Sequence, residues 1–268
     1  MRERLVAAAA SARGTHIEDD NLVGENLSLV EDPQVVVGSF EETYLALPEE
    51  VILEVARDHQ RYFGLRGPKG DLMPNYLAVV NTAERPDKIA IGNDRVMRAR
   101  LADAQFFHRE DLKTPLRDRK QDLGGIVFQN RLGSVLQKVE RMETLVPALG
   151  ALGDCADDTI DVARQGAGLC KNDLVTWMVG EFPALQGHVG RAYALAVDTP
   201  APVAEVIADH YAPKGASDDV APTEAAALVA LAERLDTLVG CFAIGLSPTG
   251  ATDPYGLRRA CIGSLRTL

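Results

Sequence analysis

Residues 62–80 read YFGLRGPKGDLMPNYLAVV, and this stretch decides the fold class of the first part of the chain. Two runs of aromatic and aliphatic residues, Tyr62-Phe63-Gly64-Leu65 and Tyr76-Leu77-Ala78-Val79-Val80, flank the sequence Gly67-Pro68-Lys69-Gly70-Asp71. Glycine and proline in the middle segment favour a turn, so the stretch predicts a β-hairpin. Val35-Val36-Val37 predicts one more short strand.

An amphipathic helix is predicted between these strand signals. Pro48-Glu49-Glu50 can begin it, because proline is well tolerated at the start of a helix. The apolar side of this helix consists of Val51, Ile52, Val55 and Ala56. Strand and helix signals thus alternate between residues 33 and 111. We therefore expect an α+β fold for the first part of the chain.

The chain after about Lys113 shows helical spacing and no strand signal. Helices are expected over residues 116–132, 135–149, 159–179, 185–197 and 203–211. The clearest helix runs from about Thr223 to Phe242. One continuous apolar stripe on this helix consists of Leu228, Leu231, Ala232, Leu235, Leu238, Val239 and Phe242. The second part of the chain is therefore expected to be all α.

A last helix is predicted from its N-terminal signals. Asp253 can accept backbone N–H groups as the N-cap, and Pro254 suits the first helical position, where a missing donor costs nothing. The expected buried stripe of this helix is Leu257, Cys261, Leu265 and Leu268. At the other end of the chain, residues 1–13 contain an alanine run that is expected to belong to a helix.

The composition is typical of a soluble globular protein. Of the 268 residues, 46% are hydrophobic and 25% are charged, and no apolar run approaches the roughly 20 residues of a membrane helix. We therefore expect a cytoplasmic protein without a membrane segment. Four cysteines lie far apart in the sequence and are expected to be buried, reduced thiols: Cys155, Cys170, Cys241 and Cys261.

The net charge of −11 argues against a general nucleic-acid binder, because phosphate contacts need a positive potential. The segment from Lys88 to Arg131 is a local exception, with ten basic residues and six acidic ones. This segment includes Gly92-Asn93-Asp94-Arg95-Val96-Met97-Arg98-Ala99-Arg100, which places three arginines on a predicted helix. An anionic partner and a solvated, salt-bridged helix surface both remain open as interpretations.

Several motifs occur in an order that is characteristic of one family. They are His59-Gln60-Arg61-Tyr62-Phe63, Gly92-Asn93-Asp94-Arg95-Val96 with Ala99-Arg100-Leu101-Ala102-Asp103-Ala104, Phe128-Gln129 with Leu132-Gly133, Asp173-Leu174-Val175-Thr176 with Met178-Val179-Gly180-Glu181-Phe182 and Leu185-Gln186-Gly187, Asp236-Thr237-Leu238-Val239-Gly240, and Asp253-Pro254 with Leu257-Arg258-Arg259-Ala260. Together they resemble the beta subunit of the bacterial heterotetrameric glycyl-tRNA synthetase. The resemblance extends over nearly the whole chain from about Asn21.

The resemblance implies a domain organisation. Residues 1–112 would form an N-terminally truncated α/β domain similar to the B3/B4 domain of phenylalanyl-tRNA synthetase. Residues 113–150 would form connecting helices, and residues 151–268 an all-α domain of the HD-phosphohydrolase type. Family beta subunits are much longer, so the chain would be a central fragment of such a subunit.

The resemblance also implies partners. In the family, the alpha subunit activates glycine with ATP and Mg²⁺, whereas the beta subunit contributes recognition of the glycine tRNA and supports the α2β2 tetramer. The fragment itself is expected to contain no catalytic residue and no cofactor. Its role would be tRNA recognition and subunit assembly.

Five arginines are the candidate tRNA-binding residues. They are Arg95, Arg98 and Arg100 in the first part of the chain and Arg258 and Arg259 in the last helix. Such arginines would contact phosphate and ribose and would not read base sequence. The alternative is ion pairing within the protein. For the first group this would be Asp94 with Arg98 and Arg100 with Asp103, and for the second group salt bridges between helices.

The HD-type resemblance raises a different possibility, a metal-dependent phosphohydrolase. That chemistry needs histidines and aspartates around a divalent cation. The position of the His-Asp pair holds Asn172-Asp173, preceded by Lys171, and no histidine lies between His108 and His188. We therefore interpret Lys171, Asn172, Asp173 and the distal Asp236 as a degenerate site without metal.

Two further expectations concern single residues. Asp236 flanks an apolar stripe, so we expect it to be partly buried with Lys171 or a helix-end N–H group as its partner. His59 follows an amphipathic helix, where a structural or capping role competes with a role as a base or substrate ligand. A scaffold that only holds subunits together is the remaining functional alternative.

Overall fold

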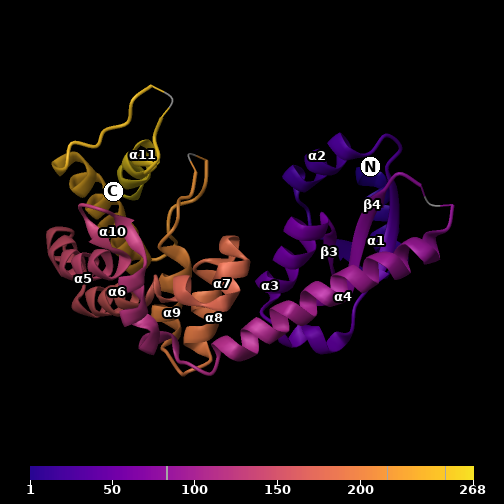
Figure 1. Cartoon of the computed structure of the whole chain (residues 1–268), viewed down its shortest axis with the longest axis horizontal. Helices are drawn as coiled ribbons and strands as arrows, with labels where there is room; N and C mark the ends of the chain where they lie inside the picture. The colour runs from indigo at the N-terminus through magenta and orange to yellow at the C-terminus, as the bar shows by residue number, and fades with distance from the viewer. Residues whose placement is uncertain (83, 216, 251) are drawn as a thin grey trace. The chain divides into compact units, whose positions relative to one another are not determined.

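The computed structural model describes residues 1–82, 84–215, 217–250 and 252–268. The chain divides into two compact units, Met1–Glu110 and Asp111–Leu268 (Figure 1). The first is an α+β unit with a four-stranded antiparallel sheet, and the second is mostly helical. The coarse fold class expected from the sequence is therefore confirmed, whereas the named domain types stay predictions.

The first unit is built around one sheet with the strand order β1-β3-β4-β2. Its elements are α1 (Arg2–Ser11), β1 (Thr15–His16), α2 (Asp20–Leu29), β2 (Gln34–Ser39), η1 (Glu42–Ala46), α3 (Glu49–Glu54), the π-helical turn η2 (Val55–His59), β3 (Phe63–Arg66), β4 (Leu72–Val80) and α4 (Pro86–Asp111), whose last residue belongs to the second unit. The predicted hairpin is β3 and β4, and the predicted short strand is β2, which pairs with β4. These sequence predictions are confirmed.

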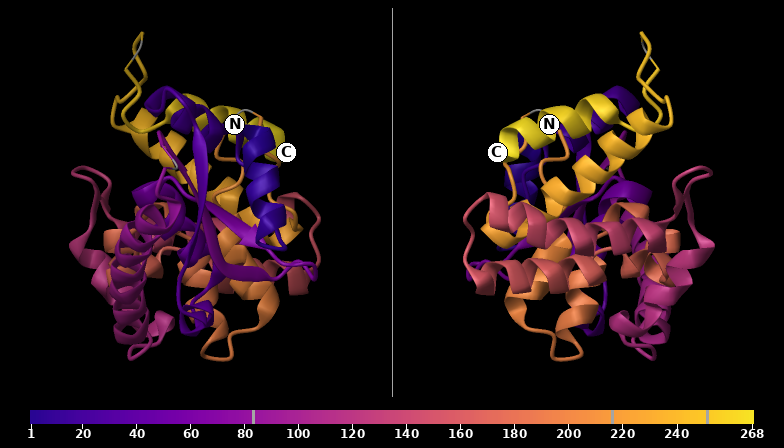
Figure 2. Two further views of the ribbon diagram at one scale, coloured as in Figure 1. Left: turned by 90° about the vertical axis from the view of Figure 1, so that its right-hand side faces the viewer. Right: turned by 90° about the vertical axis from the view of Figure 1, so that its left-hand side faces the viewer.

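The two faces of this sheet are covered by different helices. Leu77 of β4 belongs to a buried cluster with Leu5 of α1 and Leu22 of α2. Tyr76, the preceding residue, reaches Asp94 of α4. Because successive strand residues point to opposite faces, α1 and α4 lie on opposite sides of the sheet (Figure 2).

The second unit contains helices of very different lengths. Its elements are η3 (Leu116–Gly125), β5 (Val127–Gln129), β6 (Gly133–Ser134), α5 (Val135–Leu152), α6 (Asp157–Leu169), η4 (Asn172–Val175), α7 (Trp177–Glu181), η5 (Pro183–Leu185), α8 (His188–Leu195), α9 (Ala201–Asp209), α10 (Glu224–Ala243) and α11 (Leu257–Thr267). Its main apolar core takes side chains from α5, α6, α9 and α10, and includes Met142, Ala163, Val206 and Val229. Figure 2 shows the long helices α5, α6 and α10 side by side.

The prediction of an all-helical second part is wrong at one place, and one of the predicted helices is interrupted. The helix expected over residues 116–132 ends at Gly125 and is followed by a two-stranded hairpin, β5 and β6. Gln129 accepts the N–H groups of Arg131 and Leu132, and Gly133 takes a positive φ of 89°, so the local chemistry favours a turn. The helix expected over residues 159–179 is interrupted between α6 and α7.

The apolar stripe of α10 is only partly buried. Leu228 and Leu231 near its start are 7% and 8% exposed. Val239 and Phe242 near its end are 66% and 55% exposed. The apolar stripe is therefore exposed over the last two turns, because helical spacing identifies an apolar face but not what covers it.

The last helix starts later than its sequence signals suggest. Asp253 accepts the N–H groups of Leu257 and Arg258 at 2.8 and 2.9 Å, as a capping residue would. The helix nevertheless begins at Leu257 after Gly256, which is left-handed with φ 63°, so the expectation that Pro254 is the first helical residue is wrong.

The predicted buried stripe of α11 is also wrong after its first residue. Leu257 is buried, but Leu265 is 70% exposed and Leu268 is 86% exposed. The helix turns its small residues inward instead, and Gly263 packs against the Arg234 side chain of α10. Cys261 is exposed and Cys155 half-buried, so only two of the four free cysteines, Cys170 and Cys241, are buried as expected.

Candidate functional site

The arginines of α4 differ in their surroundings. Arg95 is exposed and forms no ion pair with any described residue. Arg98 is half-exposed, and its Nε lies 2.5 Å from Glu41 Oε1. Arg100 is half-buried. Of these three residues, Arg95 thus offers the guanidinium that is most open to an anionic partner.

Asp94 does not form the expected pair with Arg98. Its Oδ1 accepts the backbone N–H of Ser39 at 2.8 Å and the hydroxyl of Tyr76 at 2.7 Å. The carboxylate therefore fastens α4 to strands β2 and β4. Burial, and then the Asp94 carboxylate, raise the pKa of Tyr76.

Arg258 and Arg259 lie in the first turn of α11 and are exposed. Neither takes part in an ion pair among the residues that the structure describes. Asp253 is nearby, and backbone hydrogen bonds, chiefly from Arg258, lower its pKa, with the two guanidiniums adding to the effect. The salt bridges between helices that were weighed as the alternative are therefore not formed by these two arginines.

Asp173 of η4 is fully buried. Its Oδ2 accepts the N–H of Gly187 at 2.6 Å, whereas its Oδ1 has no hydrogen-bond partner among the described atoms. Burial raises the pKa of Asp173 to about 6. The neighbouring Asn172 donates to the carbonyl of Leu116 at 3.1 Å, so it serves to join η4 to η3.

Lys171 is a buried cation of this region. Its Nζ lies 2.6 Å from Glu233 Oε1 and 3.8 Å from the centre of the Tyr211 ring. Burial alone would lower the pKa of Lys171, but the Glu233 carboxylate outweighs it and raises the value. Burial would likewise raise the pKa of Glu233, yet Lys171 and then His210 hold it at about 2. The pair is therefore fully ionised near neutral pH.

His210 completes the cluster around Glu233. Its Nε2 lies 3.7 Å from Glu233 Oε2 and makes no hydrogen bond to any described atom. Burial, and then the Lys171 charge, lower the pKa of His210 to about 3. The imidazole is therefore neutral near pH 7, and Lys171 supplies the positive charge beside Glu233.

Asp236 is buried as expected, but its partners are different from those predicted. Lys138 Nζ lies 3.2 Å from its Oδ2, and Arg141 forms a two-pronged contact with both of its oxygens. Lys138 also donates to Thr237 Oγ1 at 2.7 Å. Lys171 instead pairs with Glu233. The expected Lys171–Asp236 pair is therefore wrong.

Four charged or titratable residues of this region were missed by sequence reasoning, namely Lys138, Arg141, His210 and Glu233. One signal for Lys138 was available, because it falls in the buried stripe of α5 with Val135, Val139 and Met142. A charged residue inside an apolar stripe needs a buried partner. That signal predicts a buried carboxylate, although not which one.

The buried carboxylates of this region do not fit a divalent metal. Asp236 is bound to an ammonium and a guanidinium, and Glu233 to the Lys171 ammonium. Across the described residues, no group of three His, Cys, Asp or Glu side chains could hold a metal ion. Lysine and arginine side chains thus neutralise Asp236 and Glu233.

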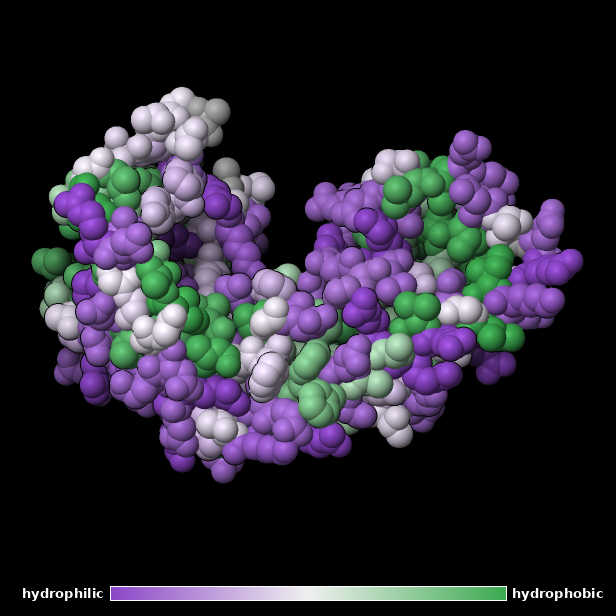
Figure 3. All heavy atoms as spheres, viewed as in Figure 1, coloured by the Kyte–Doolittle hydropathy of each residue, from purple (hydrophilic) through white to green (hydrophobic). Residues whose placement is uncertain are grey.

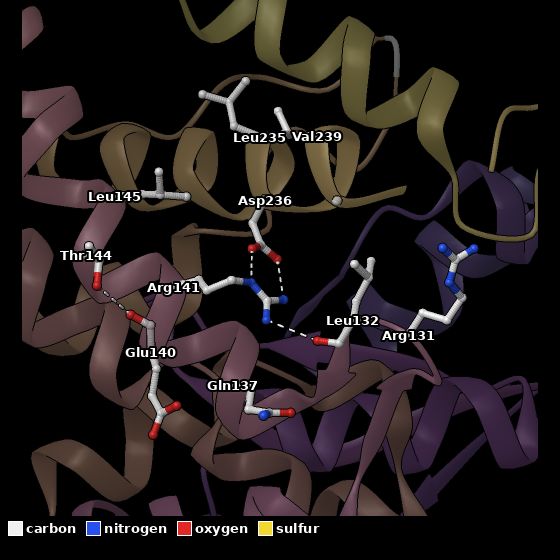
Figure 4. A pocket seen from close by; sticks show the side chains of 11 residues that line it. Arg131, Leu132, Gln137, Glu140, Arg141, Thr144, Leu145, Leu235, Asp236 and Val239 are labelled. Carbon is white, nitrogen blue, oxygen red and sulfur yellow. Dashed lines mark hydrogen bonds and ion pairs between the residues drawn. The ribbon is translucent and has the colours of Figure 1, made fainter. Parts of the chain in front are cut away.

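An open groove of about 870 Å³ lies between α5 and α10, with the Arg141–Asp236 pair on its floor (Figure 4). Leu132 packs against Gly240, where a β-carbon would approach its side chain to 3.0 Å. The lining residues are Arg131, Leu132, Gln137, Glu140, Arg141, Thr144, Leu145, Leu235, Asp236, Val239 and Gly240. Asp236, Val239 and Gly240 belong to the Asp236-Thr237-Leu238-Val239-Gly240 motif.

A family model described as "Glycyl-tRNA synthetase beta subunit" matches residues 1–268. The chain belongs to this beta-subunit family. It is 50% identical over 265 residues to the glycine–tRNA ligase beta subunit of Myxococcus xanthus, an alignment that covers 98% of this chain and 38% of that protein. The corresponding protein of Desulforudis audaxviator is 46% identical over 262 residues, with 97% and 38% covered.

A third beta-subunit relative, from Geobacter sulfurreducens, is 42% identical over 269 residues, with 100% of this chain and 39% of that protein covered. The chain thus spans about 38% of the length of the curated relatives it matches. The resemblance inferred from the motifs is confirmed by these matches. Separately, none of the helices that the structure describes is both long and apolar enough to cross a membrane.

Proposed function

We propose that this chain is the tRNA-recognition and assembly part of the beta subunit of a heterotetrameric glycine–tRNA ligase. The alpha subunit would activate glycine with ATP and Mg²⁺, and the beta subunit would help to hold the glycine tRNA. Membership of the beta-subunit family supports this proposal. The observation that carries the tRNA part is the exposure of Arg95, Arg258 and Arg259 without ion-pair partners among the described residues.

Exposed arginines without ion pairs are informative because the chain as a whole is acidic. In a chain of net charge −11, most cations are expected to pair with the abundant carboxylates. Exposed guanidiniums without such pairs can bind phosphate through two parallel hydrogen bonds and release condensed counterions. Arg95 belongs to α4 and the other two to α11, so each unit supplies its own cations.

The domain types are part of the same proposal. The first unit would be the B3/B4-like domain of residues 1–112, and the second would comprise connecting helices of residues 113–150 and an HD-type domain of residues 151–268. The four-stranded antiparallel sheet of the first unit and the helical core of the second are compatible with these assignments.

A metal-dependent phosphohydrolase is a weaker proposal for the second unit. Asp173 keeps one oxygen on the Gly187 N–H, and Asp236 is bound by Lys138 and Arg141. A divalent cation would have to displace these buried positive charges, which the surrounding helices hold in place. The contacts therefore favour a structural role for Asp173 and Asp236 over a role as metal ligands.

The tRNA proposal is tested by the salt dependence of tRNA binding to the intact two-subunit enzyme. We expect Arg95→Ala and Arg259→Ala each to flatten the slope of log K against log salt by about 0.7 to 0.9 units if one phosphate contact is lost. Arg164→Ala is the matched control, because Arg164 of α6 is exposed and pairs with Asp161. Unchanged slopes in both test variants would reject phosphate contact by these arginines.

The scaffold alternative predicts a different result. If these arginines serve assembly alone, their replacement should weaken association of the alpha and beta subunits while the salt dependence of tRNA binding stays the same. Analytical ultracentrifugation of the variants, measured beside tRNA binding, separates the two proposals.

A further inference from the structure

We infer that a small pocket between residues 213–215 and α11 binds a terminal phosphate group, that is, inorganic phosphate or a phosphate monoester. The pocket has a volume of about 30 Å³ and is lined by Pro213, Lys214, Gly215, Arg259, Ile262 and Gly263. The inference deepens the proposed function and rests on it at Arg259, which that function already assigns to phosphate. Lys214 and the residues behind the pocket are new to the site.

The two cations that line the pocket have no ion-pair partner in the part of the chain that the structure describes. Lys214 in the connection between α9 and α10 is exposed, and so is Arg259 of α11. Hydrophilic residues cover much of the surface seen in Figure 3, so an exposed cation does not by itself mark a site. Here, however, two unpaired cations flank one opening.

A buried guanidinium lies behind this opening. Arg234 of α10 is 9% exposed, and a β-carbon on the pocket residue Gly263 would approach its Nε to 2.7 Å. Its Nη1 has no hydrogen-bond partner among the described atoms. Burial lowers the pKa of Arg234, and the Glu233 carboxylate, which is bound to Lys171, offsets this only in part. A buried charge without a counter-charge is costly, so a negative group in the pocket would stabilise Arg234.

Two arginines hold the loop side of the pocket in place. Arg234 Nη2 donates to the carbonyl of Pro213 at 3.1 Å, and Arg266 Nη1 of α11 donates to the carbonyl of Gly215 at 3.3 Å. Both bonds fasten the connection between α9 and α10, which runs beside α11 (Figure 1). A wall that is already fixed loses little conformational entropy when a ligand binds. The pocket is therefore preformed.

The charges around the pocket match a terminal phosphate. Four cations gather there, namely Lys214, Arg234, Arg259 and Arg266. Set against them are the carboxylates of Asp218, beside Gly215, and of Asp253, which interacts with the charge of Arg259, so two positive charges are in excess. A terminal phosphate carries about 1.5 to 2 negative charges near pH 7, whereas a carboxylate or a phosphodiester carries one. The balance of charge therefore favours a terminal phosphate.

The size of the pocket limits how much of the ligand can enter. One water-sized group needs roughly 10 to 15 Å³ by this measure, so the 30 Å³ of the pocket admits about two phosphate oxygens. The guanidinium of Arg259 offers parallel donors and Lys214 a compact charge, a combination that suits an oxyanion. A sugar or a base would stay outside. Inorganic phosphate and the 5′-phosphate of a tRNA therefore share the chemistry that this pocket recognises.

The first test is the binding of radiolabelled inorganic phosphate to the intact two-subunit enzyme by equilibrium dialysis. Lys214→Gln and Arg259→Gln should each weaken binding at one site per beta subunit at least about tenfold, because each removes a charge-assisted contact. Lys69→Gln is the matched control, since Lys69 is exposed, forms no ion pair with a described residue and lies in the first unit. It should leave phosphate binding unchanged. Thermal unfolding confirms that the three variants fold.

The second test identifies the source of the phosphate. Binding of tRNA with and without its 5′-phosphate is measured for the wild-type enzyme and for Lys214→Gln. If the pocket holds the 5′ end, removing that phosphate should weaken binding to the wild type at least about tenfold and leave binding to the variant unchanged. If both tRNAs bind the wild type equally while Lys214→Gln weakens binding in the first test, the ligand is inorganic phosphate.

The inference is overturned if Lys214→Gln behaves like Lys69→Gln with inorganic phosphate and the wild type does not distinguish the two tRNAs. That result leaves the salt slope of Arg95→Ala unaffected, because Arg95 belongs to the first unit. Conversely, an unchanged salt slope of tRNA binding would reject the proposed function at Arg95, while the binding of inorganic phosphate still tests the pocket. Failure of the inference and failure of the proposed function are thus distinguishable.

Discussion

The hydroxyl of Tyr76 donates a 2.7 Å hydrogen bond to Asp94 Oδ1 and thereby fastens the longest helix of the first unit to its sheet. The same oxygen accepts the Ser39 N–H, so one carboxylate joins β2, β4 and α4. Tyr76 also stacks on Tyr62 with the ring centres 4.4 Å apart. Asp94 therefore has a structural task, although it lies next to candidate tRNA-binding arginines in the sequence.

Tyr76→Phe is expected to lower the free energy of unfolding by about 1.5 to 3 kcal/mol, because it removes a hydrogen bond to a charged acceptor. The ring and its stacking contact remain in this variant. Chemical denaturation measures the change. Tyr44→Phe is the control, since the Tyr44 hydroxyl makes no hydrogen bond among the described residues, and it should change stability by less than about 0.5 kcal/mol. Equal effects of the two substitutions would contradict the role given to Asp94.

Gly38→Ala is expected to destabilise the first unit by about 1 to 3 kcal/mol, because the added methyl group would overlap a packed ring. A β-carbon at Gly38 would come within 2.1 Å of the Tyr76 ring. Gly24→Ala is the matched control, since nothing lies within 4 Å of its β-carbon in α2. That change should stabilise the helix by up to about 1 kcal/mol. Thermal unfolding distinguishes the expected destabilisation by Gly38→Ala from the expected stabilisation by Gly24→Ala. A Gly38→Ala variant as stable as the wild type would refute the packing argument.

The fold of the first unit follows from local signals that the sequence carries. Residues 67–71 fix the turn of the hairpin, and the alternation around Tyr76 and Leu77 identifies two differently covered faces. In the second unit, the burial of the last helical turns was harder to predict. Val239 of α10 and Leu265 of α11 are exposed, although they continue apolar stripes whose first turns are buried. Helical spacing alone does not reveal which turns another element covers.

The candidate site was predictable only in part. Asp236 was correctly expected to be buried, whereas the interpretation of Lys171, Asn172, Asp173 and Asp236 as a degenerate metal site stays a prediction. The partners of Asp236 come from α5, nearly 100 residues away in the sequence, and such long-range pairing leaves no local pattern. That any of the candidate arginines contacts RNA stays a prediction.

Lys171→Met is expected to lower the free energy of unfolding by about 3 to 5 kcal/mol, because it leaves the Glu233 carboxylate without its 2.6 Å partner in a region of little solvent. Lys88→Met on the exposed side of α4 is the control and should have an effect below about 0.5 kcal/mol. Adding Glu233→Gln to Lys171→Met should recover part of the loss in a double-mutant cycle. If the double variant is as unstable as Lys171→Met alone, the Lys171 ammonium does not stabilise the fold by pairing with Glu233.

Asp173→Asn is expected to change how stability depends on pH, because burial raises the pKa of Asp173 from 3.8 to about 6. The folded chain therefore holds this proton more tightly than the unfolded chain does. The resulting stabilisation is complete below pH 3.8 and is lost as the pH rises through about 6. Relative to Asp173→Asn, the wild type should thus lose about 1.4 kcal/mol of stability for each pH unit across this window.

Comparing the wild type with Asp173→Asn separates the contribution of Asp173 to the pH dependence of stability from the contributions of its neighbours. Glu233 and His210 have lowered pKa values of about 2 and about 3, so their contributions change with pH in the opposite direction, but they are present in both proteins. In the Asp173→Asn variant the amide oxygen can still accept the Gly187 N–H, which preserves the contact made by Oδ2. Denaturant unfolding at several pH values between about 4 and 7.5, the range in which the wild-type carboxyl loses its proton, measures the difference. If that difference stays constant across the range, the buried Asp173 carboxyl does not titrate near pH 6.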